Sequence, residues 1–419
     1  MVRVISSILL LRKLPETLVT SSSANCHNKY LEVACNPING QAHTYTFSNQ
    51  THNQPFLPSL NINNSSTFTP ATLEDEQLVT FGVLGFVALL NIGIRTLLVV
   101  QHLTSTSSEM SYKIEVVVKN ILLGEGPHWS AEKQELIYVD LPGKHVHRYV
   151  PATGKDYSVG LNGRVTFVIP IESEKNKYVI SLERDIAVLE WDGVSHEYTS
   201  LKTIHTVEHD YPKNRFNDAK CDPQGRIWTG TMGDEPTPGN VDPGKGNIYC
   251  LDLEGKLNLH VDKIGISNGL AWSKDSTKFF YIDSVAYSVD VFDFNAAAGT
   301  ISNRRVLFDL KKHGISGLPD GMCTDIDGNL WVAVYMGGKI LHLDSKTGNL
   351  IKIIDFTGRA SKITSAAFGG PNLDELYVTS ATLGLSPEQL AIDKDAGALF
   401  KITNLGTRGA SAVKVPIRN

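Results

Sequence analysis

From about residue 111 to the C-terminus, short runs of apolar and β-branched residues alternate with polar turns rich in Gly, Asp and Asn. One kind of run recurs at a nearly regular spacing, with successive start positions 41 to 53 residues apart. Its six copies are Ile137-Tyr-Val-Asp, Tyr178-Val-Ile-Ser, Ile227-Trp-Thr-Gly, Phe280-Tyr-Ile-Asp, Leu330-Trp-Val-Ala and Leu376-Tyr-Val-Thr. A period of this length predicts a solenoid or a propeller built from one repeated supersecondary unit.

Each repeat has room for four short strands separated by turns. In the first repeat, residues 126–129, 136–140 and 146–150 form distinct apolar or alternating runs. Turns such as Asp222-Pro-Gln-Gly-Arg supply the Gly that a tight hairpin needs. One repeat therefore has the composition of one propeller blade.

Helical periodicity of any length is scarce between Ser111 and Asn419. The pattern therefore predicts an all-β fold, a six-bladed β-propeller over residues 110–419, rather than an α/β barrel. The early strand from Tyr112 to Val118 is expected to complete the last blade and close the ring.

Residues 1–109 are a different kind of sequence, which we interpret as a mostly disordered N-terminal extension unrelated to the propeller. Residues 21–72 are rich in Ser, Asn, Thr and Gln and lack the apolar periodicity of a core. Residues 78–100 are apolar and about long enough to cross a bilayer, although Asn91 and Arg95 interrupt them. The sequence leaves open whether this stretch is a membrane tether, or instead a buried helix or a poorly selected leader. Met110 follows it and would serve as the start of a shorter form.

Composition and charge exclude several classes of protein. The 42% hydrophobic and 20% charged residues are typical of a globular chain, and the net charge of −5 gives no basic surface for nucleic acid. The five cysteines are odd in number and form no CxxC pair, which argues against a zinc knuckle or a disulfide framework. We therefore expect free thiols and a cytoplasmic propeller domain, with a membrane-anchored full-length form if residues 78–100 span a bilayer.

Four segments carry polar residues in Gly/Pro-rich or apolar surroundings, where a core would not require them. They are Gly124-Glu-Gly-Pro, Arg215-Phe-Asn-Asp, Ile266-Ser-Asn-Gly and Leu318-Pro-Asp-Gly. Their Glu, Asn and Asp side chains are oxygen ligands of the kind that hard divalent cations prefer. Each segment alone also has an ordinary interpretation, because Asn268-Gly and Asp320-Gly are good turn dipeptides and Arg215 with Asp218 would make a surface ion pair.

Taken together, the motifs resemble the regucalcin and gluconolactonase family, also called senescence marker protein 30. The resemblance covers essentially all of residues 111–419 and none of the extension. It rests on Gly124-Glu-Gly-Pro-His-Trp, Arg215-Phe-Asn-Asp-Ala-Lys-Cys-Asp-Pro-Gln-Gly, Ile266-Ser-Asn-Gly-Leu-Ala-Trp, Phe280-Tyr-Ile-Asp-Ser, Ile301-Ser-Asn-Arg-Arg, Pro319-Asp-Gly-Met-Cys, Leu330-Trp-Val-Ala and Ala367-Phe-Gly-Gly.

The resemblance implies one divalent cation, Ca²⁺, Zn²⁺, Mn²⁺ or Mg²⁺, held by Glu125, Asn268 and Asp320. It implies that Arg215 and Asn217 bind the substrate, and that Glu235 lines the substrate entrance. We expect the Gly/Pro-rich loop of residues 233–246 to act as a lid. Its composition differs from that of its family counterparts, so substrate preference is the property that transfers least.

The function that the resemblance implies is metal-dependent hydrolysis of a small-molecule sugar lactone, with Asp320 as general base. Three alternatives stay open. The first is a calcium-binding protein of calcium homeostasis, and the second is a hydrolase of another substrate, as in luciferin-regenerating enzymes. The third, an interaction propeller of the WD or kelch type, lacks its repeat signatures.

Overall fold

The computed structural model describes residues 30–35, 43–48, 112–237 and 239–416. The chain divides into two compact units, Met1–Thr106 and Ser107–Asn419. In the first unit, strands β1 (Tyr30–Cys35) and β2 (His43–Ser48) pair antiparallel. Both segments carry the β-branched and aromatic residues that favour strands. The disorder expected for the rest of residues 21–72 concerns residues outside those described.

The remaining expectations for the extension, including the apolar stretch 78–100 and the start at Met110, concern residues outside those described. Within the described ranges, no helix is long and apolar enough to cross a membrane.

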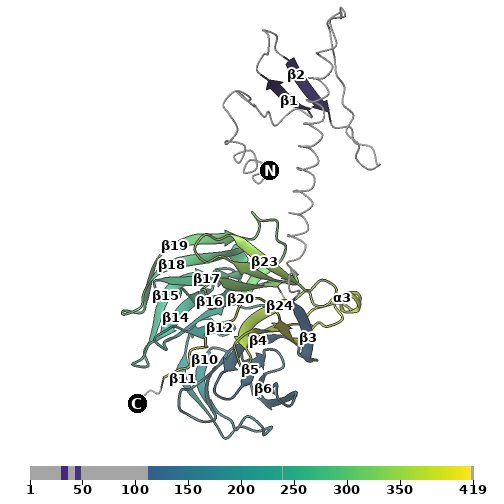
Figure 1. Ribbon diagram of the computed structural model, residues 1–419. Helices are drawn as coiled ribbons and strands as arrows, with labels where there is room; N and C mark the ends of the chain where they lie inside the picture. Colours follow the sequence, from purple (N-terminus) through teal and green to yellow (C-terminus); the bar gives the residue numbers. More distant parts are fainter. Residues whose placement is uncertain (1–29, 36–42, 49–111, 238, 417–419) are drawn as a thin grey trace, which may run out of the picture. The chain divides into compact units, whose positions relative to one another are not determined.

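The second unit is a ring of six four-stranded antiparallel sheets (Figure 1). Blade 1 holds β4 (Gly124–Ser130), β5 (Glu135–Asp140), β6 (His145–Val150) and β7 (Lys155–Gly160), and blade 2 holds β8 (Val168–Pro170), β9 (Lys177–Leu182), β10 (Asp185–Glu190) and β11 (Ser200–Thr206). Blade 3 holds β12 (Arg215–Cys221), β13 (Ile227–Met232), β14 (Gly246–Leu251) and β15 (Leu257–Ile264), and blade 4 holds β16 (Ser267–Trp272), β17 (Lys278–Asp283), β18 (Ser288–Asn295) and β19 (Thr300–Asp309). Blade 5 holds β20 (Leu318–Thr324), β21 (Leu330–Tyr335), β22 (Lys339–Leu343) and β23 (Leu350–Asp355), and blade 6 holds β24 (Ile363–Gly369), β25 (Glu375–Ser380), β26 (Leu399–Thr403) and β3 (Lys113–Val118).

Two features of this ring confirm the predicted six-bladed all-β propeller. The six recurring apolar runs are the second strands of the six blades, β5, β9, β13, β17, β21 and β25. The early strand β3 pairs with β26 and so closes the ring within blade 6. A short 3₁₀ helix (Ser284–Ala286) and the helix α3 (Pro387–Ile392) lie in connections between strands.

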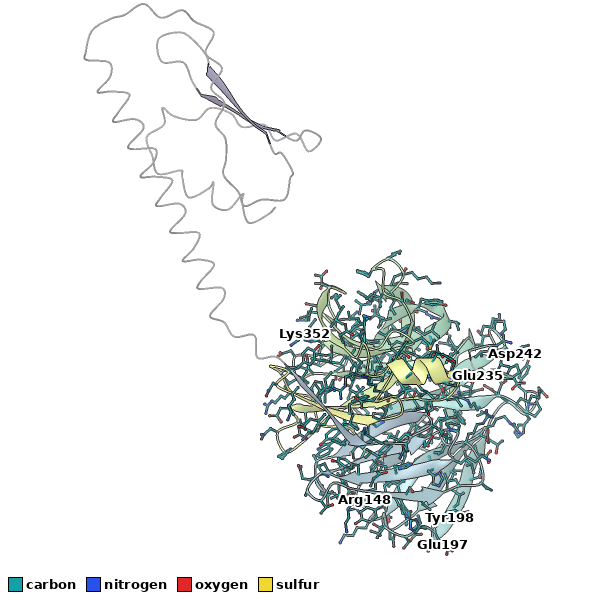
Figure 2. The ribbon with its side chains drawn as sticks, turned by 90° about the vertical axis from the view of Figure 1, so that its right-hand side faces the viewer. Arg148, Glu197, Tyr198, Glu235, Asp242 and Lys352 are labelled. Carbon is teal, nitrogen blue, oxygen red and sulfur yellow. The ribbon has the colours of Figure 1, made fainter. Side chains whose placement is uncertain are left out.

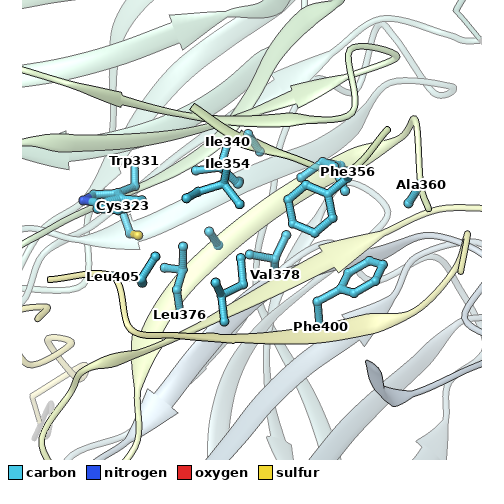
Figure 3. Close-up of a cluster of buried hydrophobic side chains, with 14 of the residues drawn as sticks. Cys323, Trp331, Ile340, Ile354, Phe356, Ala360, Leu376, Val378, Phe400 and Leu405 are labelled. Atoms are coloured by element: carbon cyan, nitrogen blue, oxygen red, sulfur yellow. The ribbon is translucent and has the colours of Figure 1, made fainter. Parts of the chain in front are cut away.

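The hydrophobic core fills the spaces between neighbouring blades. Between blades 5 and 6, Trp331, Phe356, Leu376 and Phe400 are almost completely buried and belong to one cluster (Figure 3). A second strand such as β21 is covered on both faces, because it lies between two neighbouring blades. This is why the runs read as nearly continuous apolar stretches rather than as strict alternation.

The Asp of the recurring Asp-x-x-Gly turn anchors its blade through a buried carboxylate. In blade 5, Asp325 accepts hydrogen bonds from the Asn329 N–H at 2.9 Å, the Trp331 indole at 3.2 Å and the His342 imidazole at 2.9 Å. Asp222 makes the same contact with the indole of Trp228 in blade 3. The turn residues predicted from sequence therefore also hold the large core aromatics in place.

Replacing Asp325 with Ala is expected to lower the free energy of unfolding by about 3 kcal/mol, because two buried donors and one partly buried donor lose their acceptor. Burial raises the pKa of Asp325, but hydrogen bonds from His342, Asn329 and Trp331 outweigh burial and hold the pKa below 3.8. The stabilisation is therefore present above the unfolded-state pKa and disappears as the pH falls through the folded-state pKa. Urea titrations from neutral to acidic pH measure both effects. The exposed Asp327→Ala is the matched control, and an equal loss in both variants would contradict the anchoring role.

Candidate active site

Five of the six predicted site residues lie near the starts of the innermost strands, around the central channel. The innermost strands β12, β16, β20, β24 and β4 contact one another in sequence around the axis. Glu125 is on β4, Arg215 and Asn217 are on β12, Asn268 is on β16 and Asp320 is on β20. All five are buried, with 5% to 9% of their surface exposed. The ring therefore brings together four segments that are far apart in the sequence.

A β-bulge interrupts each of these four strands beside its site residue. The strand register shifts between Glu125 and His128, Phe216 and Ala219, Asn268 and Leu270, and Pro319 and Met322. A bulge bends the strand and re-aims the side chain next to it. The four shifts at one level of the ring allow side chains of successive strands to point into the channel.

The glycine that follows each expected metal ligand lets neighbouring strands approach closely. A Cβ on Gly269 would lie 2.7 Å from the carbonyl oxygen of Asp320, and a Cβ on Gly321 would lie 2.2 Å from the hydroxyl oxygen of Ser365. These dipeptides therefore lie inside strands, and the alternative interpretation of Asn268-Gly and Asp320-Gly as hairpin turns is wrong. The glycines are required by close packing around the channel.

Three carboxylates share the buried interior of this site. Burial raises the pKa of Glu125, and the charge of Asp218 raises it further. The pKa of Asp320 is raised well above 3.8 by burial and by the charges of Glu125 and Asp218. Arg215 acts in the opposite direction on both pKa values, but its ion pair is with Glu235.

This arrangement fits a divalent cation, which would relieve the repulsion among buried oxygen anions. Among the described residues, no three His, Cys, Asp or Glu side chains converge closely enough to hold a metal ion by themselves. The set expected from the sequence differs from such a group because its third member is the amide of Asn268.

A series of hydrogen bonds connects the substrate-side residues with the expected ligands. Arg215 donates to the amide oxygen of Asn217 at 2.6 Å, and Asn217 donates to the amide oxygen of Asn268 at 3.1 Å. Asn268 donates to the Ser284 hydroxyl at 2.8 Å, which donates to the carbonyl of Pro319 at 2.7 Å. The series crosses blades 3, 4 and 5 and fixes the orientation of both amides.

The guanidinium of Arg215 faces the expected substrate entrance. Its Nη2 lies 3.7 Å from a carboxylate oxygen of Glu235, which also accepts a hydrogen bond from the Gly239 N–H at 2.8 Å. Glu235 and Asp242 belong to the loop between β13 and β14 and lie on the same side of the ring (Figure 2). Glu235 therefore connects this loop with the substrate-side arginine.

Arg215 and Asp218 are both buried, so their interpretation as a surface ion pair is wrong. Asp218 instead accepts a hydrogen bond from the Ala219 N–H and contributes negative charge to the site. Sequence reasoning assigned no site role to Asp218 or to Ser284. The signal was present, because both lie inside the Arg215-Phe-Asn-Asp and Phe280-Tyr-Ile-Asp-Ser motifs.

Comparison with known proteins adds independent evidence. The family model of the SMP-30/gluconolactonase/LRE-like region matches residues 123–382. Regucalcin of Gallus gallus is 41% identical over 300 residues, which cover 71% of this chain and 97% of that protein. The solved structure of a luciferin-regenerating enzyme is 41% identical, with a TM-score of 0.70, and the match covers 73% of this chain and 100% of that chain. A calcium-binding regucalcin of Agrobacterium tumefaciens shares the fold at 24% identity and a TM-score of 0.64, covering 74% of this chain and 98% of that chain.

Proposed function

The chain belongs to the SMP-30/gluconolactonase/LRE-like family, and from this premise we propose that it is a lactone hydrolase that acts on sugar lactones and uses one divalent cation. The observation that carries the proposal is the cluster of buried carboxylates beside a buried arginine and two oriented amides. Buried anions that raise one another's pKa are costly without a cation. Their presence near the channel mouth supports a functional rather than a structural role.

Glu125, Asn268 and Asp320 would hold the cation, which when bound would supply Lewis-acid polarisation of the lactone carbonyl. Asp320 would act as the general base that accepts a proton from the attacking water. Arg215 and Asn217 hold the hydroxyls or the carbonyl oxygen of the lactone ring in position. The loop with Glu235 covers the entrance and limits the access of bulk water.

Two comparisons favour other functions that the experiment below must distinguish from lactone hydrolysis. The relatives named regucalcin include a protein described as calcium-binding, which favours a calcium-handling role as the second candidate. The match to a luciferin-regenerating enzyme favours a different substrate at the same site. The positive charge of Arg215 so close to the expected ligands would not help a simple calcium buffer, which supports the enzyme.

The deciding experiment measures gluconolactone hydrolysis by the full chain after chelation and after separate addition of Ca²⁺, Mg²⁺, Mn²⁺ or Zn²⁺. We expect chelation to reduce the rate at least a hundredfold and one or more of the four cations to restore it. Asn268→Ala is expected to need a much higher cation concentration, because it loses one ligand. Cation binding without turnover would favour calcium handling or another substrate, and full activity after chelation would contradict the metal requirement.

A further inference from the structure

The far end of the central channel holds a second cavity, of about 390 Å³. Its wall is built by residues at the ends of the same innermost strands whose starts carry the candidate active site. They are His128 on β4, Lys220 on β12, Trp272 on β16, Cys323 on β20 and Phe368 on β24. The cavity therefore opens at the opposite end of the ring and is separate from the lactone site.

The C-terminal segment crosses this cavity as a strap between two blades. At one end, the carbonyl of Arg408 accepts a hydrogen bond from the Ile326 N–H, and at the other the Val415 N–H donates to the carbonyl of Pro170. Between these anchors, residues 410–413 line the cavity and are exposed on their outer side. None of these four residues takes part in a backbone hydrogen bond within the described part of the chain. In Figure 1 the yellow C-terminal segment ends beside the blade that contains β10 and β11.

The charge of the cavity wall is positive. The ammonium group of Lys220 donates to the carbonyl of Met322, and neither Lys220 nor Lys274 forms an ion pair with a described carboxylate. The one acidic residue of the wall is Asp325, whose carboxylate already accepts the buried hydrogen bonds of its blade. The charge of Lys220 acts to lower the pKa of Asp218, which lies outside this wall. Among the described residues of the wall itself, the two lysines carry positive charge without a paired carboxylate.

The remaining wall is mainly apolar, with the hydroxyl groups of Ser273, Ser276, Thr324 and Ser411 among its apolar residues. Trp272 and Phe368 are 8% and 5% exposed, and the strap adds two alanines, a serine and a valine. Burial and the nearby charge of Lys220 hold the pKa of His128 at about 3, so its ring is neutral, and its Nε2 has no hydrogen-bond partner among the described residues. The apolar part of the wall favours a ligand with a hydrocarbon portion over a sugar or a free phosphate.

We propose that this cavity is a binding site for a small apolar monocarboxylate, with the carboxylate at Lys220 and the hydrocarbon part between Trp272, Phe368 and the strap. Lys274 adds to the positive field at the opening. The site goes beyond the lactone hydrolysis proposed above, because it shares none of the residues assigned to that reaction and takes a ligand of different chemistry.

Isothermal titration calorimetry on the full chain tests the proposal with octanoate, 1-octanol and octylammonium, three probes of equal chain length and different charge. We expect octanoate to bind at one site, 1-octanol to bind at least tenfold more weakly, and octylammonium not to bind. Equal binding of octanoate and 1-octanol would overturn the proposal, because the lysines would then contribute nothing.

Two exposed positions test the location without disturbing the core. Ala412→Trp places an indole on the strap and is expected to reduce octanoate affinity at least tenfold, while Lys274→Met reduces it severalfold. Lys346→Met removes an exposed charge outside this cavity and is the matched control, expected to bind octanoate like the parent chain. Lys220→Met is expected to give the largest loss of affinity. If the change at this partly buried position impairs folding, the two surface variants still decide the test.

A final measurement separates this cavity from the lactone site. Ala412→Trp is expected to hydrolyse lactone at the parent rate, and octanoate is expected not to compete with the lactone. Competition that persists in Ala412→Trp would place octanoate in the active site and overturn the proposal. Because binding is read by heat, the result is independent of whether lactone proves to be the substrate.

Discussion

Asp320→Asn is expected to reduce lactone hydrolysis at least a thousandfold while the chain stays folded, since Asn cannot accept the proton of the attacking water. The metal-free chain is expected to become more stable by about 1 kcal/mol, because one of three mutually repelling buried carboxylates has been neutralised. Thermal unfolding with and without a chelator, alongside hydrolysis rates, measures both effects.

The two readouts distinguish a site residue from a residue that only supports the fold. A structural residue would lose stability and activity together, whereas Asp320→Asn is expected to lose activity and gain stability in the absence of metal. The exposed Asp327→Asn serves as the control and should change neither quantity. Hydrolysis within threefold of the parent rate would contradict the role of Asp320 as general base.

Gly321→Ala is expected to lower the free energy of unfolding by about 3 kcal/mol and to weaken cation binding. The added Cβ would lie 2.2 Å from the Ser365 hydroxyl oxygen and 2.6 Å from the Ser365 Cβ, so β20 and β24 must move apart beside Asp320. Chemical denaturation and calcium titration measure the two losses.

A second substitution tests whether steric overlap is the cause. Ser365→Gly in the Gly321→Ala background is expected to recover part of the lost stability, because it removes both side-chain atoms from the overlap. Gly160→Ala is the control, since its Cβ would meet its nearest neighbour, His145, at 3.4 Å. Equal destabilisation in Gly160→Ala and Gly321→Ala would indicate a general effect of replacing glycine.

The ring of blades could be predicted from the sequence because it depends on a strong and repeated signal. A second strand such as β21 is buried between two blades, so the requirement for apolar residues is imposed on every position of the run. Ring closure by β3 could be predicted for a related reason, since blade 6 would otherwise have three strands. Both features follow from the burial of whole strands, which appears in the sequence as continuous runs of apolar residues.

The details of the site could not be predicted from the residues alone, because they depend on register. A one-residue shift at a bulge moves a side chain from one face of a strand to the other, and no residue type marks the shift between Phe216 and Ala219. Asn268-Gly is therefore compatible with a turn or with a bulged strand until the neighbouring blade is placed. The metal-binding and substrate-binding roles were assigned to these positions because their motifs resemble those of the family, and the roles stay predictions.

The pairing of β3 with β26 also has a consequence for the order of synthesis. β3 leaves the ribosome before every other propeller strand, yet its partner is the last strand to be made, with Lys113 opposite Thr403. The nascent chain therefore carries an unpaired edge strand throughout the translation of five blades. A chain that ends before β26 leaves β3 unpaired and cannot close the ring. Only a chain that has been translated as far as β26 can therefore complete blade 6.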